Sequence, residues 1–173
     1  MNMRRTAVMA LGSLLISGMA WAHADADAAH VKVDNAWARA SVPGQQASGA
    51  FMRLTAEEPL KLVAVETTAA GVAEVHEMKM EGDVMRMRAV ESLDLPKGVA
   101  VELKPGGYHL MLQQLKGPLV KDTQVPITLV FKDAKGEQSR LSLQVPVRMS
   151  APGAAAGNAH EGHGAMNHGA HMH

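Results

Sequence analysis

Hydrophobic and polar residues alternate along most of this chain with the two-residue period of β-strands, most clearly across residues 60–66. Runs of this kind recur with turn residues between them, at 31–33 with 35–39, 48–54, 60–66, 73–80, 84–90, 99–103, 108–112, 125–132 and 139–147. No stretch combines a helical period with capping residues. Short strands at this regular spacing predict an all-β domain built as a Greek-key β-sandwich, with a β-barrel as the alternative.

Turn residues predict how these strands connect. Glu-Gly-Asp at 81–83 separates two of the runs and predicts a tight hairpin with glycine inside its loop. The segment 133–136 predicts a second hairpin, and Pro-Gly-Gly at 105–107 predicts a turn immediately before the run at 108–112.

The first 22 residues predict a secretory signal peptide. Arg4 and Arg5 precede an apolar run over 7–20, and small residues follow at the positions that a signal peptidase reads. The run is too short and wrongly flanked for a membrane span. Cleavage is expected after Ala22, with Ala24 as the alternative site, and failed cleavage would leave a membrane tether.

The remainder divides into three parts: an acidic linker at 23–30, a β domain at 31–149 and a His/Met-rich tail at 150–173. The chain has 17 basic and 17 acidic residues, and losing Arg4 and Arg5 with the signal peptide leaves 15 against 17. A net charge near −2 gives no reason to expect a nucleic-acid partner. No membrane insertion is expected after cleavage. The chain contains no cysteine, so it has no disulfide and no thiolate for a metal.

Methionine and histidine recur at alternate positions within the predicted hairpin and the strand after 105–107. Because residues two apart share a strand face, each strand presents its own row of these side chains. The rows are His76, Met78 and Met80; Met85 and Met87; and His109 and Met111. The short hairpin loop allows the first two rows to lie on one face.

A face of thioethers and imidazoles has two interpretations. Methionine commonly fills cores, and for any single methionine that remains the better interpretation. The joint pattern favours a mixed site, because thioether sulfur selects Cu(I) and imidazole also suits copper, whereas zinc usually takes thiolates, carboxylates or more imidazoles. A blue-copper electron carrier is excluded, since its site requires a cysteine thiolate.

The spacing His76, ten residues, Met87, twenty-one residues, His109, one residue, Met111 resembles the H-x10-M-x21-H-x-M signature of the periplasmic copper chaperone (PCuAC) family. The resemblance covers most of 31–149. It implies a cupredoxin-like β-sandwich that binds Cu(I) through those four residues. It also implies a periplasmic carrier, not an enzyme, that passes copper by ligand exchange to cytochrome c oxidase or another assembly factor.

Three methionines of the hairpin, Met78, Met80 and Met85, lie outside the signature. Packing is the favoured interpretation for them. Capture or hand-off of copper is the alternative.

The tail predicts a second metal-binding region. Its candidate ligands are His160, His163, His168, His171, His173, Met166 and Met172. The composition predicts a segment that is disordered without metal, and several imidazoles favour Cu(II), although they also suit zinc or nickel. An uninterrupted histidine run would indicate a purification tag, but these histidines are interleaved with other residues.

Two rival functions stay open at this point. A copper-resistance or storage protein would sequester the same metal without passing it on. A copper-dependent oxidase or oxygenase could use His23 as an N-terminal ligand. However, the chain has only two Trp, one Tyr and two Phe, which are few aromatic side chains for a carbohydrate-binding face.

Overall fold

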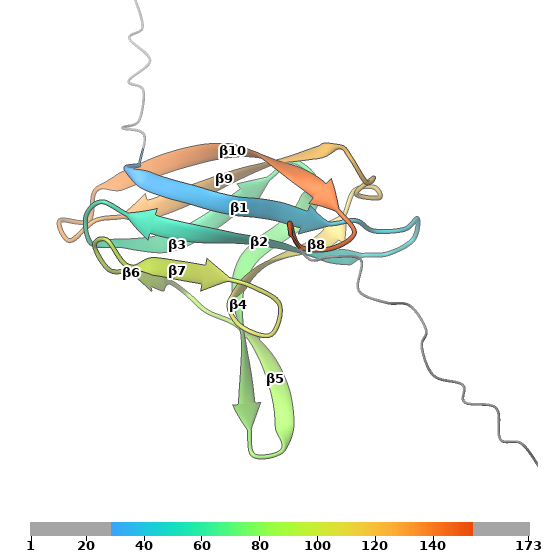
Figure 1. Ribbon diagram of the computed structural model, residues 1–173, viewed down its shortest axis with the longest axis horizontal. Coiled ribbons are helices and arrows are strands. Elements are labelled where there is room, and N and C mark those ends of the chain that lie inside the picture. The colour runs from blue at the N-terminus through green and yellow to red at the C-terminus, as the bar shows by residue number, and fades with distance from the viewer. Residues whose placement is uncertain (1–28, 154–173) are drawn as a thin grey trace, which may run out of the picture.

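The computed structural model describes residues 29–153, and within that range it contains strands and no helix (Figure 1). The ten strands are β1 (Val31–Arg39), β2 (Ala47–Ala56), β3 (Leu60–Thr67), β4 (Ala70–Glu81), β5 (Val84–Ala89), β6 (Leu93–Leu95), β7 (Ala100–Leu103), β8 (His109–Leu115), β9 (Gln124–Lys132) and β10 (Gln138–Arg148). The predicted all-β class is confirmed. The predicted signal peptide, most of the linker and the ligands of the tail lie outside the described residues.

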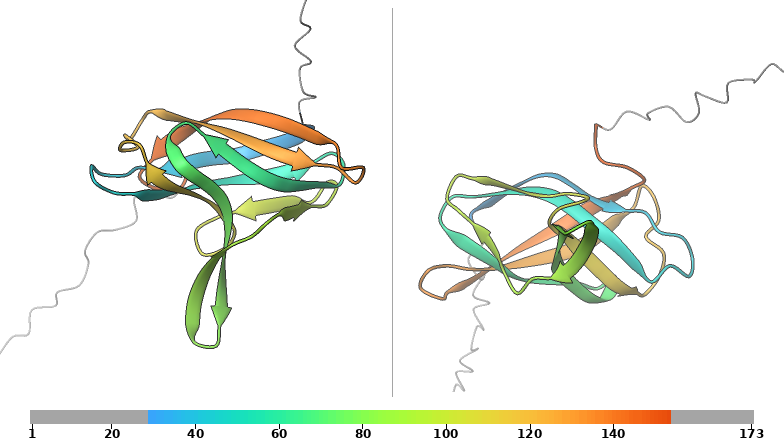
Figure 2. Two further views of the ribbon diagram at one scale, coloured as in Figure 1. Left: turned by 180° about the vertical axis from the view of Figure 1, so that it is seen from behind. Right: turned by 90° about the horizontal axis from the view of Figure 1, so that it is seen from below.

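The strands form a sandwich with the order β5-β4-β8-β2-β1-β10-β9-β3-β6, and β7 pairs with β2 beside this path (Figure 2). β1 and β10 run parallel over Ala38↔Val147 and Arg39↔Arg148, while the other pairs are antiparallel. β8 lies between β4 and β2, far from both in sequence order. This non-sequential order is typical of Greek-key connections and confirms the predicted sandwich.

The core fixes which face of each strand points outward. Val75 of β4 and Leu110 and Leu112 of β8 are buried among side chains such as Leu129 and Phe131 of β9. Burying one leucine contributes about 1.5–3 kcal/mol. A one-residue slip of β8 would expose Leu110 and Leu112. The strict alternation therefore places His109 and Met111 on the opposite face of β8.

The β4–β5 hairpin projects sideways from the sandwich, near the middle of its long axis, as Figure 1 and the left view of Figure 2 show. β5 pairs only with β4, and all six of its residues are exposed. The hairpin closes through Gly82 and Asp83, and Gly82 has φ +61°, which suits the first central position of a type II′ turn. Ion pairs Arg88–Glu77 and Arg86–Glu81, at 2.9 and 3.1 Å, link the two strands.

Candidate metal centre

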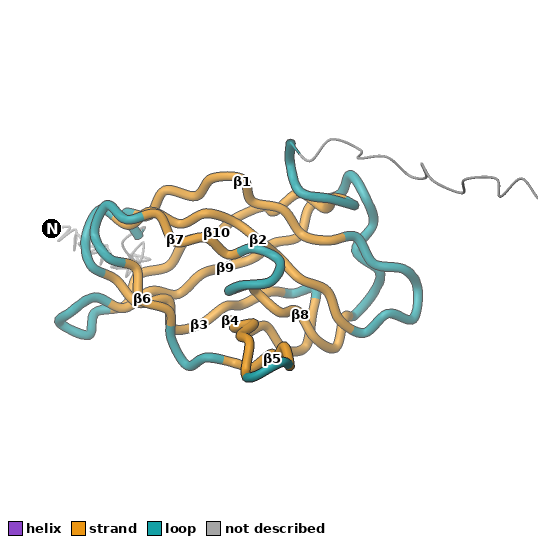
Figure 3. Tube along the Cα trace, turned by 60° about the horizontal axis from the view of Figure 1, so that its bottom comes forward, coloured by secondary structure: helices purple, strands orange, loops and turns teal. Residues whose placement is uncertain are grey.

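Two histidines meet at the junction between the β4–β5 hairpin and the sandwich. His76 of β4 lies directly opposite His109 of β8 in the last pair between these strands, and Figure 3 shows β4, β5 and β8 converging there. Their ring centroids are 5.9 Å apart. Two imidazoles that share one metal at a metal–nitrogen distance of about 2 Å hold their centroids roughly 5 to 6.5 Å apart. The 5.9 Å spacing of the two rings falls within this range.

Hydrogen bonds leave one nitrogen of each ring free to act as a ligand. His76 Nε2 lies 3.0 Å from the Glu74 carboxylate, and His109 Nδ1 lies 3.0 Å from the Gly107 carbonyl. Both partners only accept, so these nitrogens carry the protons and donate. In the neutral rings the free lone pairs belong to His76 Nδ1 and His109 Nε2. His76 Nδ1 is buried and has no hydrogen-bond partner in the described part of the chain.

Methionine sulfur completes the junction. Met87 of β5 lies directly opposite Met78 of β4, and Met111 follows His109 on the same face of β8. A cleft of about 320 Å³ is lined by Met78, Met87, His109 and Met111, together with residues of β2, the 105–106 turn and Arg39. His76 does not line the cleft but adjoins the His109 ring. The structure thus brings the four predicted ligands together.

The far wall of the cleft comes from β2. Gly49 lies opposite Met111 in the β2–β8 pairing, and a Cβ at Gly49 would lie 2.8 Å from the ring of Phe51. The Phe51 ring stacks on Trp37 with centroids 4.6 Å apart and lies 6.3 Å from the ring of His109. A glycine at this position lets the aromatic wall approach the cleft, and that wall limits the positions open to the His109 ring.

One carbonyl ties the hairpin to β8. Residues 104–107 form a turn in which Gly106 has φ +83°, as a type II turn with proline before glycine requires. The Gly107 carbonyl then accepts two hydrogen bonds, from His109 Nδ1 at 3.0 Å and from the Met78 backbone N–H at 3.2 Å. The orientation of an imidazole and the position of the methionine row are therefore set by the same atom.

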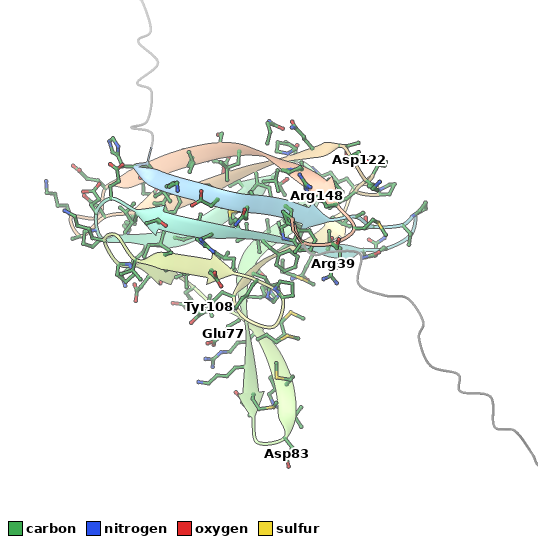
Figure 4. All side chains as sticks on the ribbon, viewed as in Figure 1. Arg39, Glu77, Asp83, Tyr108, Asp122 and Arg148 are labelled. Carbon is green, nitrogen blue, oxygen red and sulfur yellow. The ribbon has the colours of Figure 1, made fainter. Side chains whose placement is uncertain are left out.

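The opposite face of the hairpin is charged. Hydrogen bonds from Arg88 are the main cause of a lowered pKa of the Glu77 carboxyl, and the same contacts raise the pKa of Arg88. Burial, followed by the charge of Glu77, raises the pKa of Tyr108. Figure 4 shows sulfur atoms along the side of the hairpin that faces away from the labelled Glu77. The methionine sulfurs therefore lie on one face of the hairpin and the charged side chains on the other.

The three methionines outside the signature have different environments. Met78 is partly buried and lines the cleft beside Met87. Met80 and Met85 are 58% and 46% exposed. The packing interpretation is wrong for Met80 and Met85, because no element within residues 29–153 packs over this part of the projecting hairpin.

Several contributors to the site were not predicted from the sequence. Strand pairing and loop packing, which local patterns do not reveal, bring Gly49, Phe51 and Arg39 to the site. Glu74 reaches the site beside His76 on β4. Only Glu74 had a sequence signal, since it precedes His76 by two residues on the same face. Within residues 29–153, no group of three or more His, Asp or Glu side chains is placed to hold a metal. The soft donor atoms that line the cleft are the sulfurs of Met78, Met87 and Met111.

Fold and junction together define a small β-sandwich with a soft-donor cleft at the base of a projecting hairpin. A family model described as "Putative lipoprotein LpqE-like" matches residues 31–147, and the chain belongs to this LpqE-like family. It is also 30% identical over 119 residues to "Putative lipoprotein Lxx21020" of Leifsonia xyli subsp. xyli, covering 68% of this chain and 69% of that protein.

Solved structures with the same fold include PCuAC domains. The apo PCuAC domain of PmoF1 is 25% identical with a TM-score of 0.57, covering 73% of this chain and 98% of that domain. Apo-DR1885 of Deinococcus radiodurans is 27% identical with a TM-score of 0.53, covering 87% and 97%. The copper-bound PCuAC domain of PmoF2, at 21% identity and a TM-score of 0.56, shares the fold over 72% of this chain and 96% of that domain. The expected PCuAC resemblance is thus supported at the level of fold, while the family model that matches is the LpqE-like one.

The described residues, 29–153, include no helix long and apolar enough to span a membrane.

Proposed function

We propose that this protein is a copper carrier that binds Cu(I) through His76, Met87, His109 and Met111. The observation that carries the proposal is the junction itself, where His109, Met87 and Met111 line one cleft and the ring of His76 adjoins that of His109. Solved relatives of the same fold are PCuAC domains, and one of them is copper-bound. The donor set is soft and contains no thiolate, which favours Cu(I) over zinc or magnesium.

Glu74 adds to the fit between this site and a monovalent cation. All four proposed ligands are neutral when they bind metal, so they leave the +1 charge of Cu(I) uncompensated. The Glu74 carboxylate lies 3.0 Å from His76 Nε2, on the side of the ring away from the free Nδ1. A carboxylate on the non-ligating nitrogen fixes the ring orientation and raises the basicity of the ligand. It also places a negative charge close to the metal.

The exposure of the ligands suggests an order of release. Met87 is 47% exposed on a strand that pairs with a single neighbour, whereas His109 is 7% exposed and hydrogen-bonded to the Gly107 carbonyl. An acceptor's ligands would therefore displace Met87 first and His109 late. Copper would pass through intermediates shared by donor and acceptor, with no redox or catalytic step.

A location of this carrier in the cell envelope is part of the proposal, and the sequence and the family support it. The predicted signal peptide favours the periplasm, and the relatives are described as lipoproteins. We propose a copper-accepting protein as the partner, with cytochrome c oxidase or another assembly factor as the acceptor. Neither a nucleic-acid partner nor membrane insertion of the exported chain is part of the proposal.

A deletion strain separates a carrier from a storage protein. We expect loss of this gene to reduce oxidase activity under copper limitation and to leave copper tolerance unchanged, because a carrier delivers the metal and a sink removes it. Plasmid-borne wild type should restore the oxidase, whereas a Met87→Leu, Met111→Leu variant produced at the same level should not. Copper sensitivity with normal oxidase would instead identify a sequestering protein.

We also propose that the tail at 150–173 captures Cu(II) through its histidines. A chain ending at Gly153 keeps every described residue and loses all five tail histidines. We expect it to lose most Cu(II) binding, measured by isothermal titration in a non-coordinating buffer, while the Cu(I) affinity of the junction stays within about threefold, because the four proposed Cu(I) ligands all lie in the retained residues. Full Cu(II) binding by the shortened chain would refute the role of the tail.

A further inference from the structure

A second pair of methionines lies on the hairpin beyond the cleft. Met80 and Met85 are directly opposite one another in the β4–β5 pairing, as Met78 and Met87 are. Because alternate residues share a face, both pairs lie on the face that carries His76. The outer pair is one step nearer the tip, and two residues of strand correspond to about 7 Å.

Packing does not account for the outer pair. Met80 is 58% exposed and Met85 is 46% exposed, and both occupy a two-stranded ribbon. The neighbouring positions on the other face are Lys79 and Arg86, also directly opposed, and Arg86 forms an ion pair with Glu81. A ribbon with charge on one face would gain nothing in solubility from two exposed thioethers on the other.

The geometry of the pair suits a soft ion. Side chains that oppose one another directly in an antiparallel pair have Cβ atoms about 4.5–5.5 Å apart. Each methionine carries its sulfur on a flexible unbranched chain, so two opposed thioethers can converge on one ion. Thioether donors select Cu(I), and no carboxylate of β4 or β5 lies on this face between Met78 and the turn to favour a hard cation.

We propose that Met80 and Met85 form a second, weaker Cu(I) site that loads the cleft through Met78 and Met87. The proposal rests on the proposed function, since it takes Cu(I) as the cargo. Bonds from Cu(I) to Met80 and Met85 break as bonds to Met78 and Met87 form. The ion keeps its charge, and neither electrons nor protons move. Two exposed thioethers bind more weakly than two imidazoles with two thioethers, so copper moves inward.

The test uses the exported chain with methionine labelled at its ¹³C methyl groups and titrated with Cu(I) under anaerobic reducing conditions. We expect the methyl signals of Met87 and Met111 to shift first and those of Met80 and Met85 to shift saturably at higher Cu(I). A Met80→Leu, Met85→Leu variant should load the cleft at least tenfold more slowly from a Cu(I) chelator. Met149→Leu is the matched control, because Met149 is 68% exposed and lies outside the hairpin.

The methyl signals distinguish the two proposals. If Met87 and Met111 shift while Met80 and Met85 do not, or if loading is as fast in the variant as in the control, the second site is refuted and the carrier function stands. If Met87 and Met111 do not shift, the carrier function fails, whatever the outer pair does. Matching amide spectra for the variant and the control establish that both are folded.

Discussion

Replacing Met87 and Met111 together with leucine is expected to lower Cu(I) affinity by at least about 100-fold. The substitution removes two of four proposed ligands. Loss of a single group that only hydrogen-bonds to a metal ligand already lowers metal affinity by about 10–100-fold. The free energy of unfolding should change by less than about 1.5 kcal/mol, because leucine and methionine have similar volumes and Met87 is 47% exposed. Competition with a colourimetric Cu(I) chelator measures the affinity, and urea denaturation measures the stability.

The comparison should use the chain ending at Gly153, so that the donors of the tail do not mask the loss. Met149→Leu serves as the control, since it removes one exposed sulfur that does not line the cleft. Equal affinity in the parent and the double variant would show that the two sulfurs are not ligands. Function would then have to be sought in the tail.

The sequence predicted the face of each strand better than it predicted the neighbours of each strand. Alternation alone placed Met85 and Met87 on one face, and the two-residue turn at 82–83 allowed the pairing with Met78 and Met80 that the structure shows. Local signals of this kind depend only on strand period and turn chemistry. They are sufficient for the hairpin because its two strands are adjacent in sequence.

The pairing of strands that are far apart in the sequence could not be predicted from such local signals. His76 meets His109 because β8 packs between β4 and β2, and that order results from burying side chains such as Leu110 and Leu112. The aromatic wall at Phe51 reaches the cleft by the same route. β6, at Leu93–Leu95, was missed because three residues are too few for a period to be recognised. The family spacing supplied the pairing of the histidines that the local pattern lacked.

Methionines occupy two environments in this fold, and burial distinguishes them. Met52 is 3% exposed and belongs to the core with Leu54 and Leu103, whereas Met80, Met85 and Met87 are about half exposed on the hairpin. Met52 and Phe51 are adjacent on β2, so they face opposite sides of the sheet, and Met52 points to the core while Phe51 borders the cleft. Chemistry at one set of methionines should therefore be separable from stability at the other.

Met52→Ala is expected to lower the free energy of unfolding by about 2–5 kcal/mol, because truncating a buried methionine leaves a cavity that the surrounding core fills only in part. Cu(I) affinity, measured at a temperature where the variant is folded, should stay within about threefold of the parent. Met52→Leu is the matched control and should cost less than about 1.5 kcal/mol, since it keeps the volume and removes only the sulfur. Met52→Ala could instead lose as much Cu(I) affinity as the Met87→Leu, Met111→Leu variant. That result would contradict the separation, because the geometry of the junction would then depend on core packing behind β2 as strongly as on its own ligands.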